Sequence, residues 1–281
     1  MTGWRFLLSA RWAGYLALVV AFAIACSLLG TWQLARRAEA HAAIVKIDEN
    51  YDSSPAPLAT LLPALDSFED SQEWTQVELR GEYLADDQLL VRTRPLGGNP
   101  GFEVLVPLRL EDGSVFVVDR GWVAVGSTQD APDVVPAAPA GPVTVVARLK
   151  PGEPELAGRT APDGQIATIQ LDDIATRLGL PTYTGAYGLM VSESPAPPER
   201  PVALPKPPRD EGPHLSYAFQ WYVFALLGFI GFGWAIRQEY RLVNADDPEE
   251  RDRAAERERR RAQRTPTDAD VEDAILDRVE S

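Results

Sequence analysis

The residues best suited to chemistry lie where an uncharged segment begins. The segment opens with His214, and the next side chains on the same helical face are Tyr217, Ala218 and Trp221. Their i, i+3, i+4 and i+7 spacing places them together on one side of a helix. An imidazole among aromatic and small side chains can ligate a haem iron. In the alternative interpretation, His214 only satisfies backbone groups at the start of the helix.

A second group of polar and aromatic residues ends another uncharged segment, nearer the N-terminus. This group consists of Gly30, Trp32, Gln33, Arg36 and Arg37. Arg36 or Arg37 could pair with haem propionates beside His214. The amides of Gln33 and Gln220 would lie in or near hydrocarbon, where a partner on another helix is expected. Helix pairing is assigned to Gly30, Trp32, Gln33 and Gln220, and together with aromatic anchoring it already explains most of these residues.

The two uncharged segments are long enough to span a bilayer as helices. The first, residues 12–35, has 24 residues and would be about 36 Å long; the second, within residues 214–236, has 22 uncharged residues and would be about 33 Å. A cleaved signal peptide with a cleavage box at Ala23–Cys26 is the alternative for the first segment. Its apolar run continues beyond that box, which favours a retained anchor.

Alanine recurs at every fourth position of the first segment, at Ala13, Ala17, Ala21 and Ala25. Such a stripe either lets a partner helix approach closely in lipid or is ordinary apolar filler. The second histidine of the chain, His41, is the weaker ligand candidate, because an exposed position beyond this segment is expected for it.

Charges near the segment ends predict the orientation in a membrane. Arginines precede the first segment within residues 1–11 and follow the second within residues 237–281. Because positive charges tend to stay in the cytoplasm, both termini are expected there. Arg36 and Arg37 oppose this orientation, but a long acidic domain is translocated largely regardless of flanking charge. The expected location is the cytoplasmic membrane of a bacterium, with the main domain on the outer face.

Residues 36–193 are predicted to form this outer domain. Runs rich in valine, leucine, threonine and aromatic residues alternate with turn signals such as Gly97–Pro100. The expected strands are Trp74–Tyr83, Gln88–Arg94, Phe102–Leu110, Val115–Val123, Val143–Lys150, Gln165–Leu171 and Tyr183–Val191. One short helix is expected at Asp172–Gly179, with Asp172 as its N-cap. The predicted fold class is two transmembrane α-helices flanking an α+β domain dominated by an antiparallel β-sheet or partly closed barrel.

Two further segments complete the predicted organisation. Residues 194–213 contain eight prolines and are expected to form an extended linker with few hydrogen bonds. In the tail, charges of both signs alternate over Asp246–Arg264, which indicates a solvated helix or disorder.

Composition excludes several classes of protein. The formal net charge of −14 argues against a nucleic-acid partner, because phosphate recognition needs a basic surface. One cysteine and two histidines provide no CxxC, HExxH or comparable metal-ligand cluster. GxSxG, P-loop and strand-associated GxGxxG motifs are also missing from the sequence, so an enzyme is not expected.

Four motifs occur in a fixed order along the chain: LGTWQLARR at Leu29–Arg37, GEY at Gly81–Tyr83, RGWV at Arg120–Val123 and HLSYAFQW at His214–Trp221. Over about residues 12–240, they resemble the signatures of the Surfeit locus family of cytochrome c oxidase assembly factors. The resemblance implies a membrane protein that helps to mature haem–copper oxidases by handling haem a on its way to the catalytic subunit. It also implies that the family's suspected haem ligand falls on His214.

The chain departs from the family pattern at three places. Ala124 and Pro213 stand where proline and asparagine are frequent, and an aromatic residue and a lysine are missing near Ala40–Ala43. These departures affect detailed contacts and not the fold.

Two functions are therefore compared. The first is a haem a-handling assembly factor, transient or retained as an accessory subunit, whose partner is the oxidase catalytic subunit or a respiratory supercomplex. The alternative is a non-catalytic membrane subunit that braces a respiratory complex without binding haem. An outer-face adaptor unrelated to respiration is a more remote third hypothesis.

Overall fold

The protein divides into two compact units. The computed structural model describes residues 3–127, 130–156 and 158–262. One unit contains Met1–Ala38 with Gly212–Ser281, and the other contains Glu39–Glu211. The first unit is helical and the second is mainly β, so the structure confirms the expected fold class.

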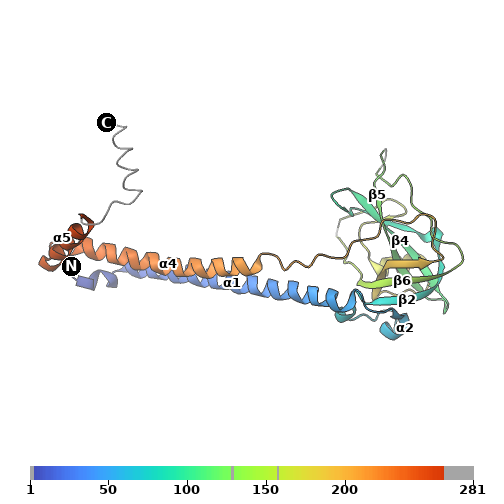
Figure 1. The fold of residues 1–281 in the computed structure, drawn as a ribbon, viewed down its shortest axis with the longest axis horizontal. Helices are drawn as coiled ribbons and strands as arrows, with labels where there is room; N and C mark the ends of the chain where they lie inside the picture. Colours follow the sequence, from blue (N-terminus) through green and yellow to red (C-terminus); the bar gives the residue numbers. More distant parts are fainter. Residues whose placement is uncertain (1–2, 128–129, 157, 263–281) are drawn as a thin grey trace. The chain divides into compact units, whose positions relative to one another are not determined.

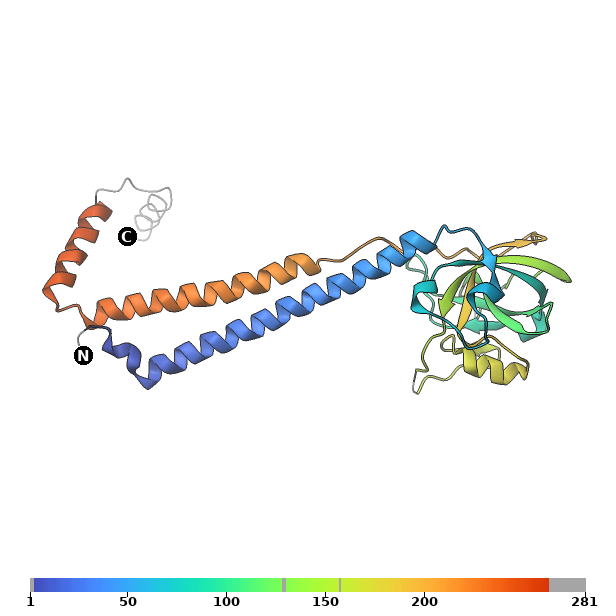
Figure 2. The same ribbon diagram turned by 90° about the horizontal axis from the view of Figure 1, so that it is seen from below.

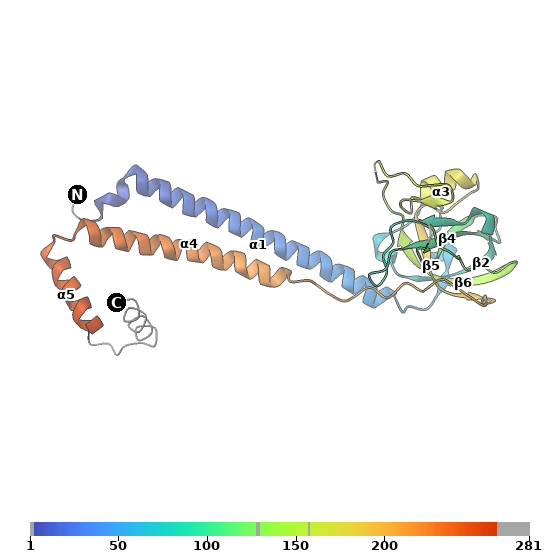
Figure 3. The same ribbon diagram turned by 90° about the horizontal axis from the view of Figure 1, so that it is seen from above.

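The helical unit is built on two long antiparallel helices. They are α1 (Ala10–Asn50) and α4 (His214–Val243), and η1 (Gly3–Leu8) and α5 (Pro248–Ala262) flank them. Helices α1 and α4 lie side by side in all three views (Figure 1, Figure 2 and Figure 3). Among the described residues, these two helices are long and apolar enough to cross a membrane.

Contacts at the N-terminal end of α1 hold it against the C-terminal part of α4. The guanidinium of Arg11 pairs with Glu239, and the ring of Trp4 stacks on Tyr240 with centroids 4.3 Å apart. Trp12 is buried nearby, with its ring 5.8 Å from that of Phe232. Because the helices are antiparallel, the C-terminal part of the apolar run of α1 must lie beside the start of α4.

The second unit is a β-barrel with small additions. Its elements are β1 (Ala56–Pro57), α2 (Leu58–Leu61), η2 (Asp70–Gln72), β2 (Gln76–Tyr83), η3 (Ala85–Asp87), β3 (Leu89–Val91), β4 (Gly101–Leu110), β5 (Val115–Ala124), β6 (Pro142–Pro151), β7 (Gln165–Ile166), α3 (Leu171–Leu178) and β8 (Ala186–Ser194). The strand order is β1-β2-β6-β8-β5-β4-β3-β7, and pairing of β2 with β4 closes a five-stranded barrel. Most pairs are antiparallel, but β5 and β8 are parallel.

The strands expected at Gln88–Arg94 and Tyr183–Val191 are Leu89–Val91 and Ala186–Ser194, and two predictions next to α3 were wrong. The strand expected at Gln165–Leu171 is only Gln165–Ile166, because the amide of Ile169 donates to a carboxylate of Glu153 (3.0 Å) and Leu171 already starts α3. The N-cap of α3 is Gln170 and not Asp172, and its side chain makes no capping hydrogen bond. The helix ends at Gly179 in the left-handed conformation, as its sequence predicts.

Strand β5 separates two buried layers. Phe116 and Val118 belong to the barrel core, whereas Val117 belongs to a second cluster with residues of α3. This alternation continues into polar residues, so neighbouring Asp119 and Arg120 occupy opposite faces of the strand. Both side chains are almost completely buried, each about 1% exposed.

Arg120 forms an ion pair inside the barrel. Its guanidinium donates to both carboxylate oxygens of Glu193 on β8, at 2.7 and 3.2 Å. It also donates to the carbonyl oxygens of Pro136 and Ala137 and lies over the ring of Tyr83, 5.6 Å from its centroid. Removing one partner of such a pair leaves a buried charge and typically costs about 3–5 kcal/mol.

Glycines in two of the sequence motifs permit close backbone approach. A Cβ on Gly81 would lie 2.1 Å from the carbonyl oxygen of Arg109, where β2 meets β4 and closes the barrel. A Cβ on Gly121 would lie 2.5 Å from the carbonyl oxygen of Val202 in the proline-rich linker. Next to Gly121, the backbones of Trp122 and Val202 exchange two hydrogen bonds of 2.8 Å.

The linker is bound to its own unit more extensively than the sequence predicts. Beyond Val202, the side chain of Lys206 pairs with Asp52 at 2.7 Å. Arg209 pairs with Asp48, and Glu211 with His41 at 2.9 Å, so the linker follows the last turns of α1. These ion pairs are largely exposed and individually weak, so the backbone bridge at Val202 is the stronger attachment.

Gly121→Ala should destabilise the β unit far more than Gly113→Ala. Both glycines have positive φ, 124° and 86°, but nothing lies within 4 Å of a Cβ on Gly113. Gly113→Ala should therefore lower the free energy of unfolding by about 1–2 kcal/mol, because alanine disfavours a positive φ. Gly121→Ala should lower it by about 3 kcal/mol or more, because its Cβ also clashes with Val202. Thermal unfolding of the full chain in detergent measures both, and equal losses would contradict the close approach.

Asp119→Asn should change how stability depends on pH. One carboxylate oxygen of Asp119 accepts from the amide of Gly121 (2.9 Å), and the other is buried without a partner among the described residues. Burial, and then the charge of Glu103, raise the pKa of the Asp119 carboxyl well above its usual range. Its contribution to stability is therefore complete below the unfolded-state pKa of about 4 and is lost as pH rises toward the folded-state pKa.

Asparagine keeps an oxygen for Gly121 and cannot ionise. Between about pH 4 and 7, the melting temperature of the wild type should therefore fall relative to that of Asp119→Asn. If the difference in melting temperature between the two proteins did not change with pH across this range, the raised pKa of Asp119 would be contradicted.

Candidate functional site

His214 is the first residue of α4 and lies against α1. Its ring is half-buried, and Nδ1 lies 2.8 Å from Oε1 of Gln33. Pro213 occupies the N-cap position without a side-chain capping bond, and its carbonyl accepts a hydrogen bond from the Ser216 hydroxyl at 2.8 Å. The structure thus brings together one residue from each of the two motifs that border the apolar segments.

This contact determines which ring nitrogen of His214 is available. An amide oxygen only accepts hydrogen bonds, so Nδ1 donates its proton to Gln33 and Nε2 keeps a lone pair in the neutral ring. Nε2 lies beside Gly212, where an added Cβ would be 3.4 Å away. The side of the ring that can bind a metal or accept a proton therefore faces the smallest residue type.

Aromatic and basic residues surround this end of the helix pair. Trp32 and Tyr217 are about half exposed, at 52% and 47%. Trp221 is half-buried and packs edge-on to Phe224. The guanidinium carbon of Arg36 lies 5.8 Å from the ring centroid of Trp32.

Arg37 is half-buried one residue further along α1. Because it directly follows Arg36, it lies at the same end of the helix pair as Trp32 and His214.

The residues that the sequence places on one face of α4 differ in how deeply they are buried. Ala218 is 1% exposed and lies in the contact with α1, whereas Tyr217 points outward. Gln220 is exposed and, within the described ranges, its amide makes no hydrogen bond. The partner on the other helix that the sequence predicts is therefore found for Gln33, as the imidazole of His214, and not for Gln220 within the described ranges.

The helix contact includes Gly30 and Gln33, to which the sequence assigned helix pairing, and also Trp12 and Cys26, which the sequence reasoning missed. Cys26 is 1% exposed, and a Cβ on Gly30 would lie 2.9 Å from Cζ of Tyr222. Along α1 the buried face contains Trp12, Cys26, Gly30 and Gln33. Trp12, Cys26 and Gln33 are multiples of seven apart, the spacing typical of long helix pairs, so this signal was present in the sequence. The alanine stripe at residues 13, 17, 21 and 25 is exposed and does not form this contact.

His41 belongs to the β unit. Its side chain is largely exposed and pairs with Glu211. No group of three or more histidine, cysteine, aspartate or glutamate side chains suited to a metal ion occurs among the described residues.

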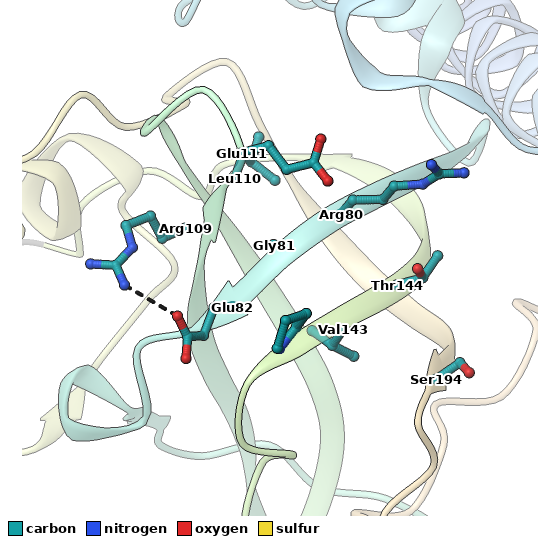
Figure 4. A pocket seen from close by; sticks show the side chains of 10 residues that line it. Arg80, Gly81, Glu82, Arg109, Leu110, Glu111, Val143, Thr144 and Ser194 are labelled. Atoms are coloured by element: carbon teal, nitrogen blue, oxygen red, sulfur yellow. Dashed lines mark hydrogen bonds and ion pairs between the residues drawn. The ribbon is translucent and has the colours of Figure 1, made fainter.

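The β unit has an open hollow of about 370 Å³ beside Gly81 (Figure 4). Among the residues that line it, Arg109 of β4 donates to its cross-strand neighbour Glu82 of β2 at 3.3 Å (Figure 4). Arg80 pairs with Glu78 at 2.9 Å. Its basic side chains are thus neutralised locally by acidic ones. The hollow lies where β2 pairs with β4 at Gly81, and its lining residues present no convergent set of reactive groups.

Gly30→Leu should separate α1 from α4 and expose the thiol of Cys26. The added side chain would collide with the Tyr222 ring, one turn away from Cys26. In detergent, we expect the rate of Cys26 alkylation by N-ethylmaleimide to rise about tenfold, because reaction requires local opening. Gly14→Leu is the matched control, since nothing lies within 4 Å of a Cβ there. Equal alkylation rates in both variants and the wild type would contradict the contact.

Comparison with known proteins identifies relatives of this chain. The family model described as the SURF1 family matches residues 20–226, a range that includes all four motifs. Uncharacterized SURF1-like proteins of Mycobacterium bovis and Mycobacterium tuberculosis are 35% identical over 241 residues, which cover 84% of this chain and 87% of each relative.

A more distant relative is the cytochrome oxidase assembly protein SHY1 of Saccharomyces cerevisiae. It is 29% identical over 110 residues, which cover 39% of this chain and 28% of the yeast protein. The family match and the mycobacterial relatives agree with the resemblance carried by the four motifs. The chain therefore belongs to the SURF1 family.

Proposed function

We propose that this chain assists the assembly of cytochrome c oxidase in the cytoplasmic membrane of a bacterium. Membership of the SURF1 family and the name of the yeast relative support the assembly role. The mycobacterial relatives support a bacterial source, and the two apolar helices support a membrane location. In this proposal both termini are cytoplasmic and the β unit is on the outer side, in keeping with the arginines that flank the apolar segments.

Within this role, His214 handles haem a for the oxidase catalytic subunit. The observation that carries the proposal is the hydrogen bond between His214 Nδ1 and Gln33, which leaves the Nε2 lone pair for an iron. Histidines that ligate metals commonly use their second ring nitrogen in this way. Tyr217, Trp221 and Trp32 offer apolar surface for a flat macrocycle, and Arg36 and Arg37 are the basic residues for its propionates.

The donor set fits a haem better than a bare ion. A haem, when bound, supplies an iron that already has four nitrogen ligands and needs only an axial one. One imidazole at the membrane boundary meets that requirement, whereas a bare ion would need several side chains. The chain itself would bind the haem, orient it and shield one face from water, and would release it or remain as an accessory subunit.

A structural role is the second candidate, and the same hydrogen bond favours it. A hydrogen bond between a histidine on one helix and an amide side chain on the other stabilises the helix pair without any ligand. In that case the chain braces a respiratory complex through its helices and its β unit, and haem is not bound.

Oxidase purified from a deletion strain distinguishes the two functions. If this chain handles haem a, the assembled subunits should lack most of their haem a absorbance. If it only braces the complex, haem a per oxidase should be normal and the complex should dissociate more readily in detergent. Normal and equally stable oxidase would exclude both functions.

Single substitutions refine this test. His214→Ala should reproduce the loss of haem a absorbance, because no second imidazole lies beside Gln33. His41→Ala is the matched control, since it replaces the other histidine of the chain at an exposed position. Normal haem a content with His214→Ala would contradict the ligand role and leave the bracing role.

A further inference from the structure

We propose that Gln33 is a positioning residue, which holds the His214 ring in the Nδ1-protonated tautomer and directs Nε2 away from α1. The inference rests on the proposed haem-handling function. It means that Gln33, from the motif at Leu29–Arg37, orients the candidate ligand of the motif at His214–Trp221. Gln33 itself touches no ligand in this scheme. It acts through the single contact of 2.8 Å between its Oε1 and His214 Nδ1.

The geometry gives Gln33 a strong influence over the ring. His214 is the first residue of α4, where no preceding helical turn packs around its side chain. Without an acceptor at Nδ1, a neutral histidine can place its proton on either nitrogen, and the ring can turn about its side-chain torsions. With the acceptor in place, one tautomer and one ring direction are selected.

The second ring nitrogen, Nε2, points away from the contact with Gln33. Gly212, with φ 69°, lies on that side of the ring, and even a Cβ there would approach Nε2 to 3.4 Å. Ala218 is buried against α1 on the next turn of the same helix face. Contact with Gln33 of α1 therefore fixes one edge of the imidazole, and Gly212 lies beside the opposite edge.

A neutral acceptor suits this role chemically. An amide oxygen orients the ring without adding a charge at the membrane boundary, where an unpaired charge is costly. Partners that orient a metal-binding histidine are typically worth about 10–100-fold in affinity. Gln33 should therefore affect haem binding clearly, but less than His214 does.

The first experiment reads the tautomer directly, without any haem. Full-length protein with ¹⁵N-labelled histidine is prepared in detergent micelles in a His41→Gln background, so that His214 gives the only imidazole signals. At a pH where the ring is neutral, the nitrogen shifts of the wild type should report protonated Nδ1. Gln33→Leu should move the populations toward protonated Nε2, and an unchanged spectrum would overturn the proposal.

The control for this measurement is Gln238→Leu. Gln238 is an exposed amide on the same helix as His214, near the opposite end. Its replacement changes hydrophobicity by the same amount and should leave the His214 signals unchanged. If both variants shifted the signals equally, the effect would be one of general helix packing, and the specific role of Gln33 would be overturned.

The second experiment uses haemin as the probe and follows its Soret band on titration into the full chain. We expect His214→Ala to abolish the axial-ligand signature and Gln33→Leu to weaken binding about tenfold or more, with Gln238→Leu at the wild-type value. Wild-type affinity in Gln33→Leu, with binding lost in His214→Ala, would overturn the positioning role and keep the proposed function. If the wild type takes up no haemin, the haem-handling function fails, and the nitrogen spectra alone decide whether Gln33 orients His214.

Discussion

The β unit depends on one buried ion pair, between Arg120 of β5 and Glu193 of β8. These strands are parallel neighbours and are far apart in the chain, so the pair joins the two halves of the barrel. Arg120 also ties down the carbonyls of the 136–137 segment and covers Tyr83. Two of the family motifs, GEY and RGWV, therefore meet inside the barrel and are structural. The other two motifs, at Leu29–Arg37 and His214–Trp221, belong to the helical unit and supply the residues of the candidate site.

Sequence patterns predicted the elements of this protein better than their connections. Apolar length identified α1 and α4, and runs of β-forming residues located the central strands. The closure of β2 on β4 depends on Gly81 meeting the Arg109 carbonyl, a non-local contact that no local pattern encodes. The strand expected at residues 165–171 failed for a related reason, because a distant carboxylate, that of Glu153, takes the amide of Ile169.

The candidate site was partly predictable. Opposite orientation of the apolar segments placed Gln33 and His214 at the same end, but the rotation of each helix about its axis decides which side chains meet. That rotation follows from the fit of Tyr222 against Gly30 and from the burial of Cys26 and Ala218. The alanine stripe left a helix contact and ordinary apolar filler open as alternatives, since small residues signal a possible contact and do not select among possible partners.

The separation of Arg120 from Glu193, 73 residues, has a consequence for how the protein is made. The buried arginine has no counter-charge until β8 has been synthesised, and Gly121 has no linker strand until Val202 follows. Non-local pairing of this kind is slow and leaves strand edges open while it is incomplete. The barrel can therefore close only after the chain has been synthesised as far as β8 and Val202, shortly before the second apolar helix begins.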